Sequence, residues 1–357
     1  MTAVSTDMAW RRFVTTLLTS LGLALSGLYG LVLMIDPYDA LSFSPDWKRY
    51  PVSRHSRDYN AILARRPEYN SAVIGNSTSM LLPPTELNQE LGARFVMLSM
   101  PAASPFEQRE LIRLFQRHHS AIRNLVVGLD SVWCHPGGAP RVLGLMENHP
   151  FPYWLYDENP WNDLPPLDET TLKKARMQAK ALLGLQIRYE HKPDGYWDFS
   201  DALHKENDPE SIRRRLHAAD RHPLPLDLPK GSEAFPDLAD LENLLGLLPA
   251  ETEKILFFAP THHLQLPTPG SDQSAAWEDC KHRAAAIAGR VPRTLVVDFR
   301  IPSPLSENDA HFIDAQHYTR PIASELIEML SAALRGKAGD LPELRVLARS
   351  AGRGGAG

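Results

Sequence analysis

The sequence predicts an α/β protein in which an open parallel sheet of five strands lies between two layers of helices, preceded by one membrane-spanning helix. After residue 70, short apolar runs alternate with segments that suit helices, as expected when both faces of a parallel sheet are covered. Hydrophobic residues make up 43% of the 357 residues and charged residues 23%. This composition is typical of globular proteins and excludes a largely disordered or collagen-like chain.

The first element is an apolar stretch near the N-terminus. Residues 13–35 contain no formally charged side chain, and a helix of that length spans the roughly 30 Å core of a bilayer. Arg11 and Arg12 precede it, so the positive-inside tendency places residues 1–12 in the cytoplasm and the rest outside. A cleaved signal peptide is the alternative, but its apolar region usually has only about 7–15 residues. We therefore expect a single-pass signal-anchor in the inner (cytoplasmic) membrane.

Five apolar runs are the expected strands. They cover residues 71–75, 94–98, 124–130, 255–258 and 294–298. Helices are expected at about 83–91, 105–118, 274–289 and 320–335. Because parallel strands are joined by right-handed crossovers, this order favours a three-layer α/β/α sandwich.

The chain after the anchor divides into an irregular lead-in at 36–70, the α/β domain at 71–335 and a tail at 336–357. A Pro-rich insertion is expected at about 133–250, with one helix at about 169–186. It contains many of the 30 prolines of the chain. The end of the tail is rich in Gly, Arg and Ala, and we expect it to be disordered.

Charge and cysteine content exclude several classes. The net charge of −5 argues against a nucleic-acid partner, because phosphate binding needs a concentrated positive face. Two cysteines are too few for a zinc site built on paired C-x-x-C motifs. An exported domain permits a Cys134–Cys280 disulfide, and a free buried thiol is the alternative. Neither a metal nor a nucleotide cofactor is expected, since no phosphate-binding glycine motif follows a strand.

The first chemical motif follows the first strand. Gly75-Asn76-Ser77 allows a sharp turn that exposes the serine hydroxyl, and the helix after it would supply N–H groups toward a negative charge. This arrangement suits a nucleophile with one oxyanion donor. The alternative is a helix N-cap without a catalytic role.

The second motif precedes the last expected helix. In Asp314-Ala-Gln-His317 the carboxylate can accept the imidazole Nδ1–H, which leaves Nε2 as a general base. A serine needs such a partner because its hydroxyl is a weak nucleophile at neutral pH. The alternative is a surface cap beside an unrelated histidine.

Together the two motifs resemble those of the SGNH (GDSL-like) hydrolase superfamily. Its first block, G-D-S, is similar to Gly75-Asn76-Ser77, and its last block, D-x-x-H, matches Asp314 and His317. The resemblance covers about residues 71–335. It implies a flavodoxin-like sheet and a Ser77–His317–Asp314 triad that acts on ester or acyl groups.

The middle blocks depart from that family. The second block usually holds a Gly whose N–H joins the oxyanion hole, but residues 98–104 contain none. The resemblance then implies the N–H of Ser77 together with that of Ala102 or Ala103. The third block, usually G-x-N, reads Gly128-Leu129-Asp130. An ionised Asp130 would repel an oxyanion, so it turns aside, is protonated, or marks a weakened hole.

In layout, the chain is similar to bacterial proteins of this superfamily that acylate cell-surface polymers. We expect a membrane-anchored extracytoplasmic serine esterase or O-acyltransferase acting on a cell-envelope polysaccharide or exopolysaccharide, within a polysaccharide-modification complex. The alternative is a weak or inactive protein of the same fold that binds polysaccharide or assists assembly. The residues expected to line the substrate pocket follow the strands, and they are Asn76, Asp130, Trp133 and His262.

Overall fold

The computed structural model describes residues 3–50, 52–53, 55–141, 151–159, 164–185, 192–199, 209–218, 235–339 and 341–350. The chain forms two compact units. The smaller unit consists of Met1–Arg54 and Glu158–Tyr189, and the larger consists of His55–Asp157 and Glu190–Gly357.

The smaller unit is built on two helices, α1 (Ala3–Ile35) and α5 (Glu169–Leu182). Within α1, the stretch Met8–Ile35 is long and apolar enough to cross a membrane. Val32 and Ile35 in its last turns pack against Ala175 of α5. The helix expected at 169–186 ends at residue 182, and Gly184, at a φ of 70°, follows it. A left-handed glycine is a common helix terminator.

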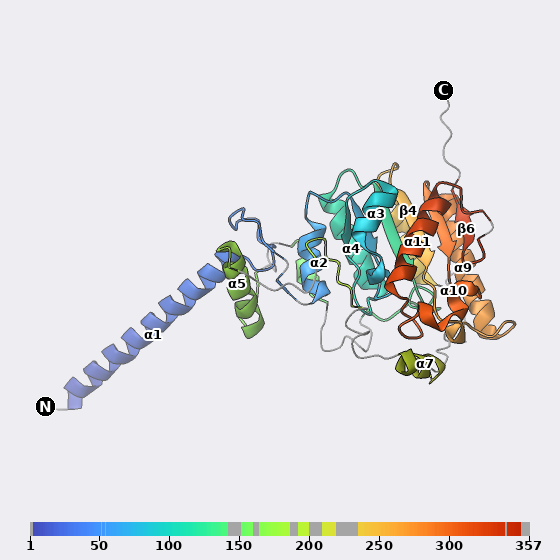
Figure 1. Ribbon diagram of the computed structural model, residues 1–357. Helices are drawn as coiled ribbons and strands as arrows, with labels where there is room; N and C mark the ends of the chain where they lie inside the picture. The colour runs from blue at the N-terminus through green and yellow to red at the C-terminus, as the bar shows by residue number, and fades with distance from the viewer. Residues whose placement is uncertain are drawn as a thin grey trace, which may run out of the picture. The chain divides into compact units, whose positions relative to one another are not determined.

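The larger unit contains a six-stranded, mostly parallel sheet (Figure 1) in the order β2-β1-β3-β4-β5-β6. The strands are β1 (Ser71–Ile74), β2 (Phe95–Met97), β3 (Asn124–Leu129), β4 (Glu253–Phe258), β5 (Thr294–Asp298) and β6 (Arg345–Arg349). The first five pair in parallel and almost every residue in them is buried. The five apolar runs of the sequence are therefore confirmed as parallel strands.

The expectation of only five strands is wrong, because β6 pairs antiparallel with β5 at the edge of the sheet. It lies in the segment that we assigned to the tail. Its residues are exposed or half-buried, and only three consecutive apolar residues, 346–348, mark it in the sequence. Arg345 instead anchors it through a 2.9 Å ion pair with Asp298, which is fully buried at the end of β5.

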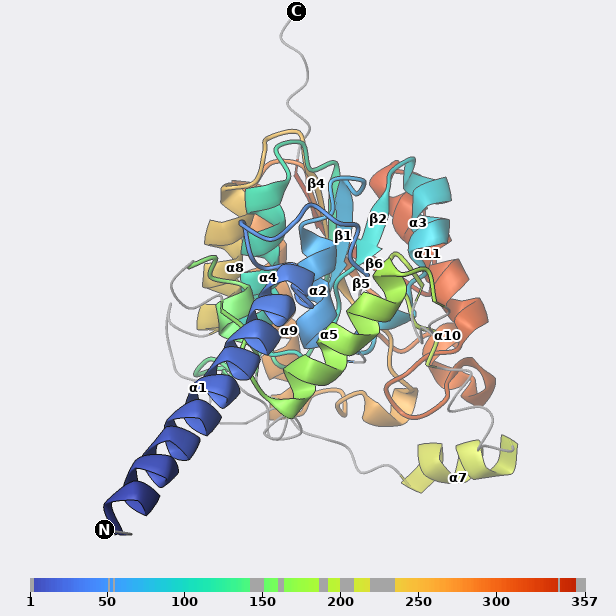
Figure 2. The same ribbon diagram turned by 90° about the vertical axis from the view of Figure 1, so that its left-hand side faces the viewer.

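Helices flank the sheet on both sides (Figure 2). On one side α2 (Ser56–Ala64), α4 (Pro105–His118), α8 (Pro236–Gly246) and α9 (Asp272–Arg290) pack in a row. On the other side α3 (Pro84–Leu91) packs against α11 (Arg320–Leu334). Shorter helices are α7 (Pro209–Ala218), α10 (Pro304–Glu307) and the 3-10 turns η1 (Ser79–Leu81), η3 (Tyr153–Leu155), η4 (His263–Gln265) and η5 (Asp309–His311).

Part of the expected lead-in is regular structure. Residues 56–64 form α2, and nearly all of its side chains are buried. The core beneath α11 includes a row of register partners across four strands, Val73, Val126, Ile255 and Leu295, packed with Leu326 and Leu330.

The open question about the cysteines is resolved in favour of a disulfide. Cys134 follows β3, Cys280 lies in α9, and both are fully buried. The bond links positions 146 residues apart and ties α9 to the loop at the carboxyl end of β3.

Candidate active site

The turn after β1 exposes Ser77 because small and polar neighbours shape it. A Cβ atom at Gly75 or at Gly128 of β3 would overlap the side chain of Ser79, so both positions require glycine. The Asn76 side-chain oxygen accepts the Thr78 N–H at 3.1 Å. The helix expected at about 83–91 is confirmed as α3, which begins at Pro84, and the 3-10 turn η1 lies between it and the serine turn. The helix expected to supply N–H groups therefore starts seven residues after Ser77.

Ser77, His317 and Asp314 lie in hydrogen-bond contact. His317 Nε2 is 2.8 Å from Ser77 Oγ, and Nδ1 is 2.8 Å from Asp314 Oδ2. Burial alone would raise the pKa of Asp314, but hydrogen bonds from the His317 ring and from two backbone N–H groups hold this pKa below its ordinary value. An ionised Asp314 accepts the Nδ1–H and leaves Nε2 to accept the serine proton.

The loop that carries His317 is held against the serine turn. A backbone bridge joins Phe312 to Tyr318, and the Tyr318 hydroxyl donates to the Thr78 carbonyl at 2.6 Å. Tyr318 is fully buried, so this bond fixes the two motifs relative to each other. Phe199 places its ring edge-on to His317 at 5.5 Å. Sequence reasoning missed both contacts: Tyr318 adjoins the motif but looks like a core residue, and nothing marks Phe199.

Backbone geometry distinguishes between the two expected oxyanion donors. The Ala103 N–H donates to Met100 O at 3.2 Å and is therefore occupied. Ala102 adopts a left-handed φ of 47°, a conformation that favours glycine. Within the described part of the chain, the N–H groups of Ala102 and Ser77 have no hydrogen-bond partner. Ala102 thus takes the conformation expected where the resembled family has a glycine. Ala103 is excluded as an oxyanion donor, because its N–H is already bonded to Met100 O.

A buried arginine holds the Ala102 turn. Arg57 of α2 donates to the carbonyls of Pro101 and Ala102 at 3.1 and 3.3 Å. The same guanidinium forms a bidentate pair with Glu107, at 2.7 and 2.9 Å, a geometry that fixes orientation as well as charge. Arg57 belongs to the segment that we expected to be an irregular lead-in, yet it is buried. These hydrogen bonds from α2 stabilise the left-handed turn at Ala102.

Asp130, the third-block residue, makes no contact with Ser77 among the described residues. Its Oδ1 accepts the Val132 N–H at 3.0 Å, while Oδ2 is buried and has no hydrogen-bond partner among the described residues. Across that same part of the chain, no interaction joins Asp130 to Ser77 or His317. Burial raises the pKa of Asp130 to about 7. Its carboxyl group is then largely neutral below this pH.

The raised pKa of Asp130 predicts that the stability of wild type and that of Asp130→Asn depend differently on pH. Between about pH 4 and pH 7 the folded protein binds the Asp130 proton and the unfolded chain does not, so stability falls as pH rises through this window. A tenfold difference in proton affinity between the folded and unfolded states corresponds to about 1.4 kcal/mol. The free energy of unfolding of wild type should therefore decrease relative to Asp130→Asn between about pH 4 and pH 8. Denaturant unfolding over this range measures it, and parallel curves for the two proteins would contradict it.

The other expected pocket residues have structural roles. Trp133 is fully buried and donates Nε1–H to Gln108 at 3.1 Å; it is a core residue and offers no surface for a sugar ring. His262 is also fully buried, with Nε2 3.0 Å from Asp309, and its backbone N–H donates to Ala315 at 3.0 Å. It supports the loop of His317 rather than lining a pocket. Asn76 is only half-buried, and its side chain shapes the serine turn.

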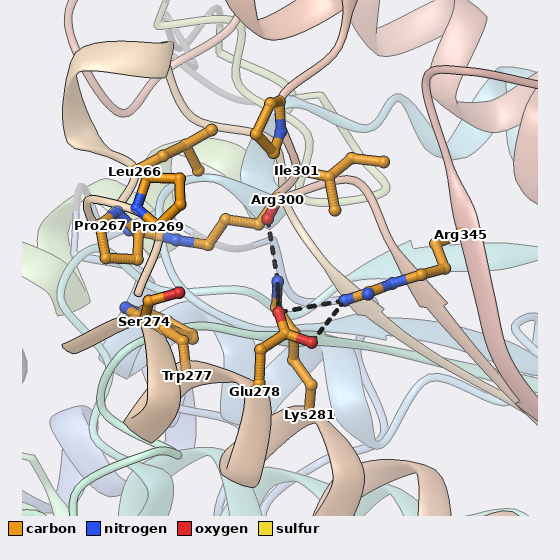
Figure 3. A pocket seen from close by; sticks show the side chains of 11 residues that line it. Leu266, Pro267, Pro269, Ser274, Trp277, Glu278, Lys281, Arg300, Ile301 and Arg345 are labelled. Carbon is orange, nitrogen blue, oxygen red and sulfur yellow. Dashed lines mark hydrogen bonds and ion pairs between the residues drawn. The ribbon is translucent and has the colours of Figure 1, made fainter. Parts of the chain in front are cut away.

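A separate pocket of about 150 Å³ lies beside α9 and β6 (Figure 3). Three of its charged side chains pair with one another: Glu278 lies 3.3 Å from Lys281 and 3.0 Å from Arg345. Lys281 also contacts buried Asp298 at 2.9 Å. None of the Ser77, His317 or Asp314 side chains lines it, and its charges stabilise the edge strand. Among the described residues, no cluster of three or more His, Cys, Asp or Glu side chains could hold a metal ion.

Comparison with known proteins does not place the chain in a family. It matches no protein-family model, and no curated protein matches its sequence.

Proposed function

We propose that the protein is a membrane-anchored serine esterase or O-acyltransferase of the SGNH type, acting outside the cytoplasm on acyl groups of a cell-envelope polysaccharide or exopolysaccharide. The observation that carries this proposal is the continuous chain of contacts from Ser77 through His317 to Asp314. Serine, imidazole and carboxylate in that order form the constellation that activates a hydroxyl for acyl transfer.

The mechanism follows from these contacts. Ser77 Oγ attacks the acyl carbonyl while His317 Nε2 takes the hydroxyl proton, and ionised Asp314 stabilises the imidazolium. The N–H groups of Ser77 and Ala102 would donate to the oxyanion. His317 then protonates the leaving alcohol, which yields an acyl-enzyme on Ser77. A second alcohol or water, deprotonated by His317, attacks this acyl group and regenerates the serine.

The fold supports the same assignment. The order of the first five strands, 2-1-3-4-5, is that of flavodoxin-like sheets, which the resemblance to the SGNH superfamily implies. In such sheets ligands bind beyond the carboxyl ends of the strands, and Ser77 follows β1 at this edge.

Export and anchoring are supported by two observations. The disulfide between Cys134 and Cys280 suits an oxidising compartment. The end of α1 is part of the folded smaller unit: the Tyr29 hydroxyl donates to Pro165 O at 3.1 Å, and Arg49 Nε donates to Ile35 O at 2.9 Å. Cleavage after α1 would remove these partners, so we propose that α1 is retained as a single-pass anchor.

A second candidate function is a binding or assembly protein of the same fold in an envelope polysaccharide complex. The observation that favours it is Asp130, which stands where the resembled family has an amide donor and whose Oδ1 accepts the Val132 N–H instead. One oxyanion donor is worth about 10²–10³ in kcat, so its loss would slow an acyl enzyme.

Labelling with a serine-reactive phosphonate probe distinguishes the serine acyl enzyme from the binding or assembly protein. We expect the full-length protein to be labelled, since the activated serine attacks phosphorus as it attacks a carbonyl, and Ser77→Ala to lose the label. Ser131→Ala is the matched control, because Ser131 is exposed after β3. Labelling that persists in Ser77→Ala would exclude Ser77 as the nucleophile. Absence of labelling in the folded wild type, together with retained polysaccharide binding, would support the binding protein.

A further inference from the structure

Exposed apolar side chains are concentrated in the smaller unit. Outside α1, its described residues with large exposed apolar side chains are Phe43, Trp47, Tyr50, Leu164, Leu167, Leu183 and Leu185. The much larger unit has only Tyr153, Trp197, Leu247, Leu341 and Val346 among its described residues. Exposed apolar patches of this kind mark a surface that contacts a partner or a membrane.

Three of these side chains, Trp47, Tyr50 and Leu183, line a pocket at the end of α1. The pocket has a volume of about 630 Å³ and lies between the last turns of α1, the segment 46–50 and the end of α5. Its lining is mostly apolar and consists of Leu31, Ile35, Trp47, Tyr50, Ala179, Ala181, Leu182 and Leu183, with Asp46 and Lys48. Leu31 and Ile35 also belong to the stretch long enough to span a membrane. The apolar lining is therefore continuous with the surface that a bilayer would cover.

The outer face of α5 carries three basic side chains and Glu169, which pairs with Lys173 at 2.6 Å. Lys173, Arg176 and Lys180 are exposed and spaced three and four residues apart, so they form one stripe along the helix. The opposite face packs Ala175 onto the end of α1. Basic side chains next to a membrane-spanning helix attract anionic lipid headgroups, and Trp and Tyr favour the membrane–water interface.

We propose that this pocket binds an anionic phospholipid, with an acyl chain between α1 and α5 and the headgroup against Lys48, the basic residue of the lining. This inference rests on the proposal that α1 spans the membrane. Lipid fits better than a protein partner, because the lining includes Leu31 and Ile35 of the span itself together with the basic residue Lys48. The helix α5 would then lie on the membrane surface as part of the anchor.

The test uses the full-length protein in nanodiscs of equimolar phosphatidylcholine and phosphatidylglycerol, followed by extraction into mild detergent and native mass spectrometry. We expect phosphatidylglycerol to remain on wild type in preference to phosphatidylcholine. Leu183→Asp should lower its occupancy about tenfold or more, because a carboxylate at an apolar site is costly to desolvate. Ala181→Trp, which fills the pocket without adding charge, should have the same effect.

Leu247→Asp is the matched control. Leu247 caps the end of α8 as Leu183 caps α5, and the two are similarly exposed at 71% and 76%. Equal occupancy in wild type, Leu183→Asp and Ala181→Trp would overturn the pocket, and equal retention of both lipids would overturn the headgroup contact. Release of wild type from membranes by alkaline carbonate would overturn the span itself. Phosphonate labelling at Ser77 reports on the catalytic proposal independently of these results.

Discussion

Replacing Asp314 with Asn is expected to lower acyl turnover by about 10⁴ while leaving the fold intact. Asp314 Oδ1 accepts the N–H groups of Gln316 and His317 at 2.8 and 2.9 Å, and an Asn oxygen can keep both bonds. The amide NH₂ would then replace Oδ2 and face His317 Nδ1. Because an amide donates where the carboxylate accepted, the imidazole would carry its proton on Nε2 and could not accept the proton of Ser77.

A second aspartate–histidine pair provides the control. Asp309 lies 3.0 Å from His262 Nε2, much as Asp314 contacts His317, but within the described residues no serine contacts the His262 ring. Asp309→Asn should therefore leave kcat within about a factor of ten, as expected for a group that only supports the loop. The kcat for hydrolysis of an activated acetyl ester and the rate of phosphonate labelling measure both variants. Equal losses in the two would mean that Asp314 has only a structural role.

The first five strands are predicted well from the sequence, because buried parallel strands consist of short runs of apolar residues. The prediction fails for β6, where ion pairs of Arg345 replace apolar burial. It also fails for Arg57, since a basic residue in an irregular segment looks solvated. The carboxylate of Glu107, which pairs with the buried Arg57, lies 50 positions further along the sequence. The residues adjacent to Arg57 in the sequence cannot reveal a partner at that distance.

The serine motif and the Asp314–His317 motif are both recognisable in the sequence. Whether they come into contact depends on the path of the loop that carries His317. Strands β3 and β4 separate β1 from β5 in the sheet, so the loop carrying His317 must pass the end of β4 to reach Ser77. The His262 N–H, after β4, holds this loop through Ala315. Position after a strand places a residue at the correct edge, yet it does not set side-chain direction. For that reason Trp133 and His262, expected at the surface of a pocket, point into the core.

The disulfide has the second large expected effect. Cys134 and Cys280 close a loop that contains the whole Pro-rich segment, since 146 positions separate them. Removing such a link increases the conformational entropy of the unfolded chain, and native disulfides typically contribute about 2–5 kcal/mol. Reduction of wild type should therefore lower the melting temperature by on the order of 10 °C. Differential scanning fluorimetry with and without dithiothreitol measures the shift.

A double variant, Cys134→Ala with Cys280→Ala, separates the bond from the reductant. It should melt near the temperature of reduced wild type and show no response to dithiothreitol. Both sulfurs are fully buried, so each Ala adds a small packing loss that the reduced wild type does not have. Comparison of the two reduced proteins isolates that loss. If thiol labelling shows that dithiothreitol has opened the bond and the melting temperature of wild type is unchanged, the link between α9 and the loop after β3 does not stabilise the fold.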